Sequence, residues 1–183
     1  MRRILTSFAL LLALPALASA PSPYADMTDR PIRALSAEQQ ADLLAGRGMG
    51  MALAAELNGW PGPAHVIELA EPMQLTPAQL AVTQRLMAEI QVAANDLGAR
   101  LIEEERALDT AFRDRSVTPA DLSARTSRIA ALQGELRDVH LRTHLAHAAL
   151  LNAEQIAAYS RLRGYAGGTP QHGGPMPGGH RHH

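Results

Sequence analysis

The sequence predicts an all-α protein built around a long antiparallel helical hairpin, and three observations support this fold class. Apolar residues recur at steps of three, four and seven along two long stretches, as in helices that share a seam. The alternating pattern typical of half-buried strands does not occur. Aromatic residues make up only 3% of the chain, which favours a core of Leu, Ile, Met and Ala.

The first twenty residues have the pattern of a secretory signal peptide. Two arginines precede an apolar run, and small residues follow it at Ala18 and Ala20. The run is too short to cross a bilayer, so we expect no membrane insertion after cleavage. Arginine takes the place of lysine throughout the chain, as in proteins of GC-rich bacteria. A secreted bacterial protein without a membrane segment is expected in the periplasm. The chain has no cysteine, so packing must hold the fold together without disulfides.

A flexible leader is predicted over residues 21–35, because this stretch is polar and rich in proline. Ser36 and Gln39 then form a helix-start signature, and the first helix is expected to run to about Leu57. Its glycines weaken it and predict a kink or a close helix contact. The phrase NGWPGP, residues 58–63, ends it, and a short helix over residues 63–70 follows.

Two long helices come next and form the hairpin. Thr76, Pro77 and Gln79 open the first, which should end near Arg115, and Thr118 opens the second. The first seam contains Leu80, Met87, Ile90, Ala94, Leu97, Leu101, Leu108 and Phe112, and the second contains Leu122, Ile129, Leu132, Leu136, Val139, Ala146 and Leu150. The short link between them predicts antiparallel neighbours.

A short last helix should start at Asn152 and end at Gly164, before a disordered Gly/Pro/His-rich tail over residues 166–183. The predicted domain therefore spans residues 36–165. It consists of the hairpin with the first helix and the short last helix packed across it. Helices of about forty residues are about 60 Å long. Such small partners cannot bury them in a compact monomer, so we expect a helical homodimer.

The phrases LTPAQ, residues 75–79, and LNAEQ, residues 151–155, each open a helix and flank the hairpin. They resemble the LTxxQ repeats of the Spy/CpxP family, which includes ZraP-like and CnrX-like periplasmic metal-responsive proteins. Asn152 replaces the usual Thr but also caps a helix. The resemblance covers roughly residues 36–165. It implies a helical dimer in the periplasm that acts as an ATP-independent chaperone, as an inhibitor of envelope-stress sensors, or as a metal sensor or buffer.

Three histidines, His140, His144 and His147, recur at helical spacing before the second phrase. Residues four apart lie one turn above each other, so His140 and His144 could share one ion with a ligand from elsewhere. The heptad register places all three histidines outside the hairpin seam, where they should be accessible. Three interpretations remain open: a metal site, a solvated or inter-helix polar stripe, and a pH-responsive interface.

The resemblance implies a metal-sensing pair at His140 and His144, with further ligands drawn from the first helix. That helix contains no histidine. It offers Met49, Met51 and Glu56, and the next helix offers His65 and Glu68. Methionine thioethers suit Cu(I), although packing is the more ordinary role of methionine.

Four tail histidines form a separate candidate: His172, His180, His182 and His183. In a Gly/Pro context they could loosely bind a Zn, Ni or Cu ion. No cofactor is required by any motif.

Two leucines are predicted to bind a partner. Leu141 and Leu145 fall away from the seam, so another helix or another protein must cover them. Removal of Arg2 and Arg3 with the signal peptide would leave 15 basic against 18 acidic residues, a balance that does not favour nucleic acid. The run Glu103–Glu105 with Arg106 is typical of a solvated helix face, and no catalytic motif accompanies it, so an enzyme is not expected.

The sequence therefore supports two hypotheses about function. The first is a periplasmic chaperone or stress adaptor that binds unfolded proteins or partner proteins. The alternative is a sensor or buffer of a heavy-metal-resistance system, which would need a membrane-sensor partner to carry the signal.

Overall fold

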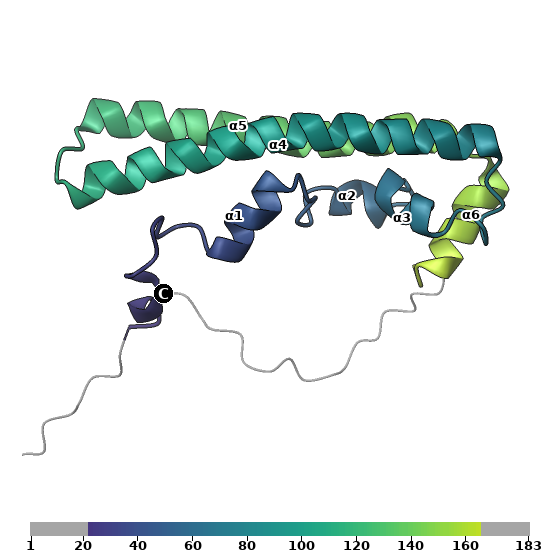
Figure 1. Ribbon diagram of the computed structural model, residues 1–183, viewed down its shortest axis with the longest axis horizontal. Coiled ribbons are helices and arrows are strands. Elements are labelled where there is room, and N and C mark those ends of the chain that lie inside the picture. The colour runs from purple at the N-terminus through teal and green to yellow at the C-terminus, as the bar shows by residue number, and fades with distance from the viewer. Residues whose placement is uncertain (1–21, 166–183) are drawn as a thin grey trace, which may run out of the picture.

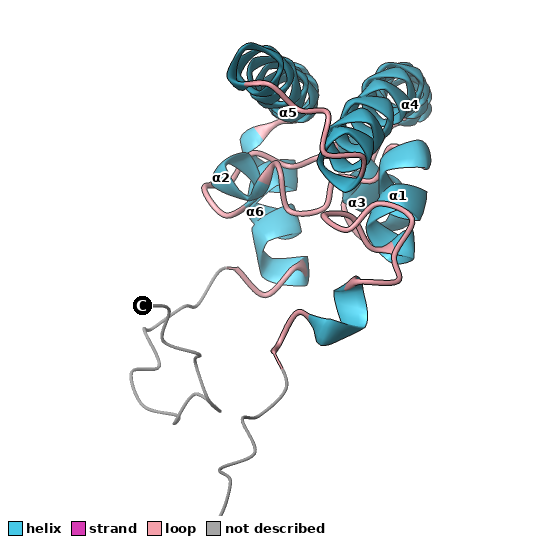
Figure 2. Cartoon of the chain, turned by 90° about the vertical axis from the view of Figure 1, so that its left-hand side faces the viewer, coloured by secondary structure: helices cyan, strands magenta, loops and turns pink. Residues whose placement is uncertain are grey.

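The computed structural model describes residues 22–165, and these residues form helices without any strand, which confirms the all-α prediction (Figures 1 and 2). The predicted signal peptide and the predicted tail lie outside the described residues. In chain order the elements are η1 (Ala25–Met27), α1 (Ala37–Leu44), α2 (Leu53–Glu56), α3 (Pro63–Glu68), α4 (Pro77–Arg113), α5 (Pro119–Ala148) and α6 (Ala153–Leu162). No helix among residues 22–165 is long and apolar enough to cross a membrane.

Helices α4 and α5 form the predicted antiparallel hairpin, and side-chain caps fix where each begins. The Thr76 hydroxyl accepts from the backbone N–H of Gln79, whose side chain in turn accepts from the N–H of Thr76. Asn152 and Gln155 repeat this reciprocal arrangement at the start of α6. Thr118 caps α5 by accepting from the N–H of Asp121. The start points predicted from sequence for these three helices are therefore confirmed.

The predicted first helix over residues 36–57 is wrong, because two short helices separated by a turn replace it. Helix α1 starts at the Ser36 cap but ends at Leu44. Beyond it, Gly46, Met49 and Gly50 adopt positive φ angles of 63°, 45° and 78°. Left-handed backbone cannot continue a right-handed helix, so the glycines end it, whereas the sequence predicted a kink or a close helix contact within one continuous helix.

The elements form two layers (Figures 1 and 2). The hairpin is one layer, and α1, α2 and α3 lie beneath it in chain order as a second, called here the lower layer. One core lies between α1 and the hairpin and contains Leu43, Leu97 and Leu136 among others. A second core at the α6 end contains Val66, Met73, Leu151 and Tyr159. The lower layer is therefore fixed to the hairpin at both ends.

The end of the predicted flexible leader is instead packed against the hairpin. Ile32 is fully buried in the first core. The backbone N–H of Arg33 donates to Asp109 Oδ1 at 3.1 Å, and its guanidinium lies 3.1 Å from Oδ2. Arg113 also contacts Asp109 and donates to the carbonyl of Pro31 at 3.3 Å. A single apolar residue among polar ones gives little pattern, which is why the sequence suggested flexibility here.

Burial of the core residues decreases toward the hairpin turn. Ile90, Ala94, Leu97 and Leu101 on α4 are buried, but Phe112 near the turn is 54% exposed. Leu122, on the other side of the turn, is 37% exposed. The lower layer covers the opposite half of the hairpin, and the candidate site lies there.

Candidate binding hollow beneath the hairpin

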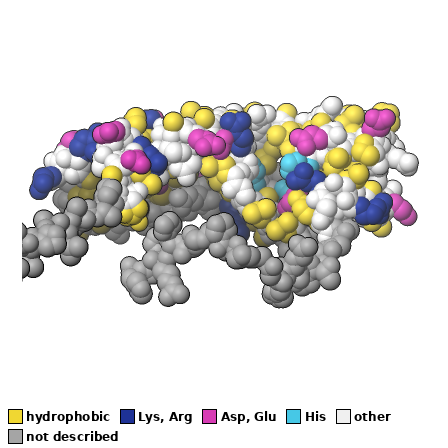
Figure 3. All heavy atoms as spheres, turned by 90° about the horizontal axis from the view of Figure 1, so that it is seen from below, with side chains coloured by type: hydrophobic (Ala, Val, Ile, Leu, Met, Phe, Trp, Pro, Cys, Tyr) yellow, Lys and Arg dark blue, Asp and Glu magenta, His cyan; other side chains and the backbone are white. Residues whose placement is uncertain are grey.

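A cavity of about 570 Å³ lies between the lower layer and the hairpin. We call it the hollow. Its lining combines apolar and polar side chains that include Met49, Leu53, Glu56, Met87, His140 and His144. Seen from below, histidine side chains lie within this depression among hydrophobic ones (Figure 3). The hollow therefore has apolar walls with a few polar groups, a composition typical of binding sites.

The prediction that the three α5 histidines are accessible is wrong. His140, His144 and His147 are 5%, 9% and 0% exposed. The heptad register describes only the contact between α4 and α5, whereas the lower layer covers this second face of α5. The stripe is therefore an inter-helix one and is not solvated.

His147 has both ring nitrogens engaged. Its Nδ1 lies 2.9 Å from the carbonyl oxygen of Pro61, and its Nε2 lies 3.0 Å from the hydroxyl of Thr83. A carbonyl only accepts, so Nδ1 carries the proton of the neutral ring. The Thr83 hydroxyl has one proton, and both Nε2 and the carbonyl oxygen of Gln79, which lies 2.8 Å away, are placed to accept it. Burial lowers the pKa of His147, against the opposing effect of the bond to Pro61, and nearby His144 lowers it further. These contacts leave His147 no free nitrogen for a metal, and they make it a tie between the two layers.

His144 has one nitrogen engaged and one directed elsewhere. Its Nδ1 donates to the carbonyl of Trp60 at 2.7 Å, which fixes the ring orientation. Its Nε2 forms no hydrogen bond within the described residues. A side chain at Gly62 would place Cβ only 2.5 Å from His144 Cε1 and Nε2. Position 62 must therefore be glycine for this ring to lie against the loop.

His140 lies one turn away and also lines the hollow. Its Nε2 is buried without a hydrogen-bond partner among the described residues. Burial lowers the pKa of His140, and the nearby His144 ring lowers it further. His140 and His144 thus bring two available ring nitrogens to one hollow, as their spacing suggested.

Glu56 is the buried acid of the site, with 7% exposure. The hydroxyls of Tyr159 and Tyr165 both donate to its Oε1, the latter at 3.0 Å. Its Oε2 lies 3.9 Å from His144 Nδ1, and Arg163 Nε lies 3.6 Å from Oε1. Burial and the bond to Glu56 raise the pKa of Tyr159. Glu56 therefore joins α6 and the residues after it to the rim of the hollow.

His65 also lines the hollow, but its ring nitrogens are directed at other groups. Its Nδ1 lies 3.3 Å from Glu68, and Arg163 Nη2 lies 3.1 Å from its Nε2. The structure therefore does not join His65 to the His140 and His144 pair. The four tail histidines lie outside the described residues. No group of three or more His, Asp or Glu side chains that could hold a metal occurs within residues 22–165.

The two leucines predicted to bind a partner differ in exposure. Leu145 is 51% exposed, and Leu141 is half-buried. A larger apolar set, missed from the sequence, lies on the lower layer. We call it the apolar patch: Leu44, Met49, Leu53, Leu57 and Trp60, each between 41% and 57% exposed. A periodic helix over residues 36–57 would have buried part of this set, which is why the pattern did not reveal it.

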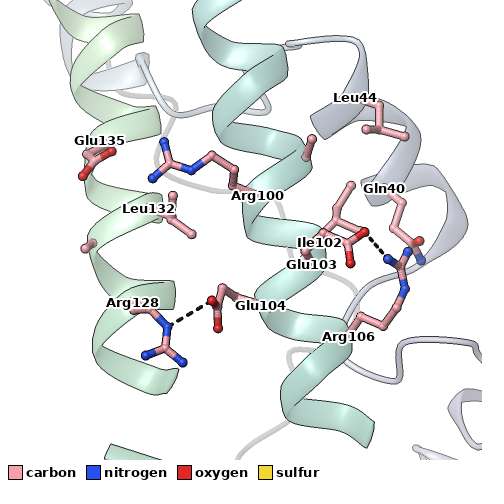
Figure 4. Close-up of a pocket in the computed structure, with 12 residues that line it drawn as sticks. Gln40, Leu44, Arg100, Ile102, Glu103, Glu104, Arg106, Arg128, Leu132 and Glu135 are labelled. Atoms are coloured by element: carbon pink, nitrogen blue, oxygen red, sulfur yellow. Dashed lines mark hydrogen bonds and ion pairs between the residues drawn. The ribbon is translucent and has the colours of Figure 1, made fainter. Parts of the chain in front are cut away.

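A second cavity of about 540 Å³ lies beside α1 and along the hairpin (Figure 4). Half of the residues that line it are charged, and most of these are paired. Arg128 Nε lies 3.0 Å from Glu104 Oε1 across the hairpin, and Arg106 pairs with Glu103 on α4. The predicted charge run is thus partly solvated and partly a tie between the two long helices.

No family model, no curated protein and no solved structure matches this chain.

Proposed function

We propose that the chain is a helical binding protein of the bacterial periplasm that holds apolar segments of unfolded or partner proteins without ATP. The apolar patch carries this proposal. Its five large side chains lie on one stretch of the lower layer, next to a hollow that Met49 and Leu53 also line. Several exposed large apolar residues on one segment, two of which line a cavity, indicate a surface that contacts other proteins. The resemblance of the LTPAQ and LNAEQ phrases to the Spy/CpxP repeats supports the same role.

Suppression of aggregation tests this function. The purified chain should keep an unfolding client soluble at a near-equimolar ratio. The double substitution Leu53→Ser and Leu57→Ser should abolish this effect while helicity is retained, because both side chains are more than half exposed and contribute little to the core. Val92→Ser is the matched control, since Val92 is 73% exposed on α4 outside the apolar patch. Equal suppression by the double variant would contradict the proposal.

A second candidate function is metal sensing or buffering, and the His140 and His144 pair supports it. Two imidazoles one helical turn apart are suitable ligands for Zn, Ni or Cu ions. When the concentration of free metal is a hundred times the dissociation constant, binding would stabilise the fold by about 2.7 kcal/mol. The melting temperature should therefore rise with one of these metals and should not rise in the double variant His140→Ala and His144→Ala.

We also propose a homodimer, in which a second copy covers the exposed part of the hairpin near Phe112 and Leu122. Light scattering at micromolar concentration should give twice the mass of the chain. A monomer at that concentration would contradict this proposal without affecting the apolar patch.

A further inference from the structure

The fold leaves one buried polar atom of the hollow unused. His140 is 5% exposed, and its Nε2 has no hydrogen-bond partner among residues 22–165. Such atoms are uncommon in folded proteins, because a buried polar group without a partner loses its bonds to water and gains none in return. The cavity of about 570 Å³ that His140 lines lies within the range of about 300–1,000 Å³ typical of ligand pockets. A ligand in the hollow can therefore supply the missing partner.

The second histidine of the hollow has its proton in a fixed place. His144 Nδ1 donates to the carbonyl of Trp60 at 2.7 Å, so Nε2 of the neutral ring carries a lone pair and only accepts. Burial lowers the pKa of His140, which keeps that ring neutral near pH 7, and a neutral imidazole can carry its proton on Nε2. The two rings thus offer one acceptor and one donor, one helical turn apart. A hydroxyl group, which both donates and accepts, satisfies both.

The rest of the lining favours an uncharged aromatic ligand. Met49 and Met87 line the hollow, and methionine sulfur makes favourable contacts with aromatic rings. The carboxylate of Glu56 already accepts from two tyrosine hydroxyls, and Arg163 Nε lies 3.6 Å from it. Arg47, another lining residue, is paired with an acid on α1. A charged ligand would therefore lose its hydration without gaining a free counter-charge, whereas a phenol, an aromatic ring with one hydroxyl, loses much less.

We infer that the hollow binds a phenol group, and that a tyrosine side chain of a bound polypeptide supplies it. The hydroxyl donates to His144 Nε2 and accepts from His140 Nε2, while the aromatic ring lies against the methionines. Met49 and Leu53 belong both to the apolar patch and to the lining, so a segment bound on the patch extends over the hollow. This inference rests on the proposed binding of unfolded segments, and it adds a preference for tyrosine among their side chains.

Binding of para-cresol, which is the side chain of tyrosine, tests the site in the full chain with a chelator present to remove metal ions. Toluene is the matched probe, because it lacks only the hydroxyl. A purely apolar cavity binds toluene more tightly, since burial of an unpaired hydroxyl is unfavourable. We expect the reverse, an affinity for para-cresol higher by about tenfold, as two hydrogen bonds would give. In nitrogen NMR spectra the Nε2 resonance of His144 should shift with para-cresol and stay unchanged with toluene.

Two variants separate the hydrogen bonds from the apolar contacts. His140→Phe removes the unpaired nitrogen and keeps an aromatic ring, whereas His144→Asn keeps a donor for the Trp60 carbonyl and lacks Nε2. Each should reduce the preference for para-cresol to about threefold or less. His65→Phe is the control and should keep the full preference, because His65 lines the hollow with its ring nitrogens directed at other groups. If His144→Asn does not fold, His140→Phe decides, since its Nε2 forms no bond that the fold could lose.

A chain that binds toluene as tightly as para-cresol, or a preference that persists in both variants, would overturn the inference. Two leucine- and serine-rich peptides that differ only by tyrosine or phenylalanine at one position identify the source of the phenol. The tyrosine peptide should bind about tenfold more tightly. Equal peptide affinities, with para-cresol still preferred over toluene, would overturn the assignment to tyrosine in favour of a free small phenol. Failure of the proposed function is distinguishable, because the apolar patch should protect even a client without tyrosine from aggregation.

Discussion

Gln79 and Gln155 exchange two side-chain hydrogen bonds, each Nε2 donating to the other's Oε1, at 2.9 and 3.0 Å. Each oxygen also accepts from the backbone N–H of its own helix cap, Thr76 or Asn152. Each nitrogen also contacts a carbonyl, that of Leu150 for Gln79 at 2.8 Å. The LTPAQ and LNAEQ phrases therefore meet in space and join the start of α4 to the start of α6.

Breaking this pair should destabilise the protein. Gln155→Leu keeps the size of the side chain but leaves the Gln79 amide without its partner, and the expected loss is about 1–3 kcal/mol. Urea unfolding measures it. Gln133→Leu on the exposed face of α5 should change the unfolding free energy by less than about 0.5 kcal/mol. The double variant Gln79→Leu and Gln155→Leu should lose less than the sum of the single losses. Additive losses would show that the two amides do not act together.

The Thr83 hydroxyl should stabilise the fold through its contact with the buried His147 ring. The change Thr83→Val keeps the shape of the side chain and removes the hydroxyl that lies 3.0 Å from Nε2 and 2.8 Å from the carbonyl oxygen of Gln79, so the buried Nε2 loses its partner. We expect a loss of about 1–3 kcal/mol in chemical unfolding. Thr126→Val is the control, because the Thr126 hydroxyl is exposed and contacts only its own helix. A Thr83 variant as stable as the Thr126 variant would show that the Thr83 hydroxyl does not support His147.

Mild acid should weaken the contact between the layers. Burial keeps the pKa of His147 below its unfolded value of about 6.5, so the folded protein binds fewer protons than the unfolded chain. The stabilisation is fully present above about pH 6.5 and is lost as the pH falls toward the lower folded pKa. Urea unfolding at pH 7.5 and 5.5 should show lower stability at 5.5. The difference should be smaller in His147→Asn, and an equal difference in both proteins would rule out this cause.

The Met49 side chain should lower the stability of the fold and strengthen the binding of client proteins. A left-handed backbone costs an L-residue roughly 1–2 kcal/mol, and glycine avoids this cost while losing about 0.5–1 kcal/mol in chain entropy. Met49→Gly should therefore raise stability slightly and weaken client binding, because Met49 lines the hollow. At the next position, Gly50→Ala should lower stability, since φ there is 78°. A Met49→Gly protein that binds clients as well as the unchanged chain would exclude Met49 from the binding surface.

Periodicity and capping residues predicted the hairpin, because these signals act within a few turns of one helix. Thr76, Thr118 and Asn152 marked three helix starts correctly. The same signals did not predict the end of α1, because it depends on the positive φ angles of Gly46 and Gly50. A hydrophobic pattern contains no information about these angles.

The candidate site was predicted only in part. Spacing brought His140 and His144 together, since residues four apart always share a helix face. The burial of His144 and His147 depends on Trp60 and Pro61, whose carbonyls come from a loop more than eighty positions away. No local pattern encodes such a contact. The role of Glu56 was missed for the same reason, because its partners Tyr159 and Tyr165 are brought to it by the second core.

The two layers differ in how their contacts span the sequence, and this sets an order of events during folding. A short turn joins α4 and α5, so these helices can pair before contacts between distant parts of the chain have formed. The lower layer depends on pairs such as Glu56 with Tyr159, 103 positions apart, whose closure costs more chain entropy. We therefore expect the lower layer to dock last and to open first. The amides of α2 and the loop at Trp60 should exchange with solvent deuterium sooner than those in the middle of α4, so brief local opening gives access to the hollow without unfolding the hairpin.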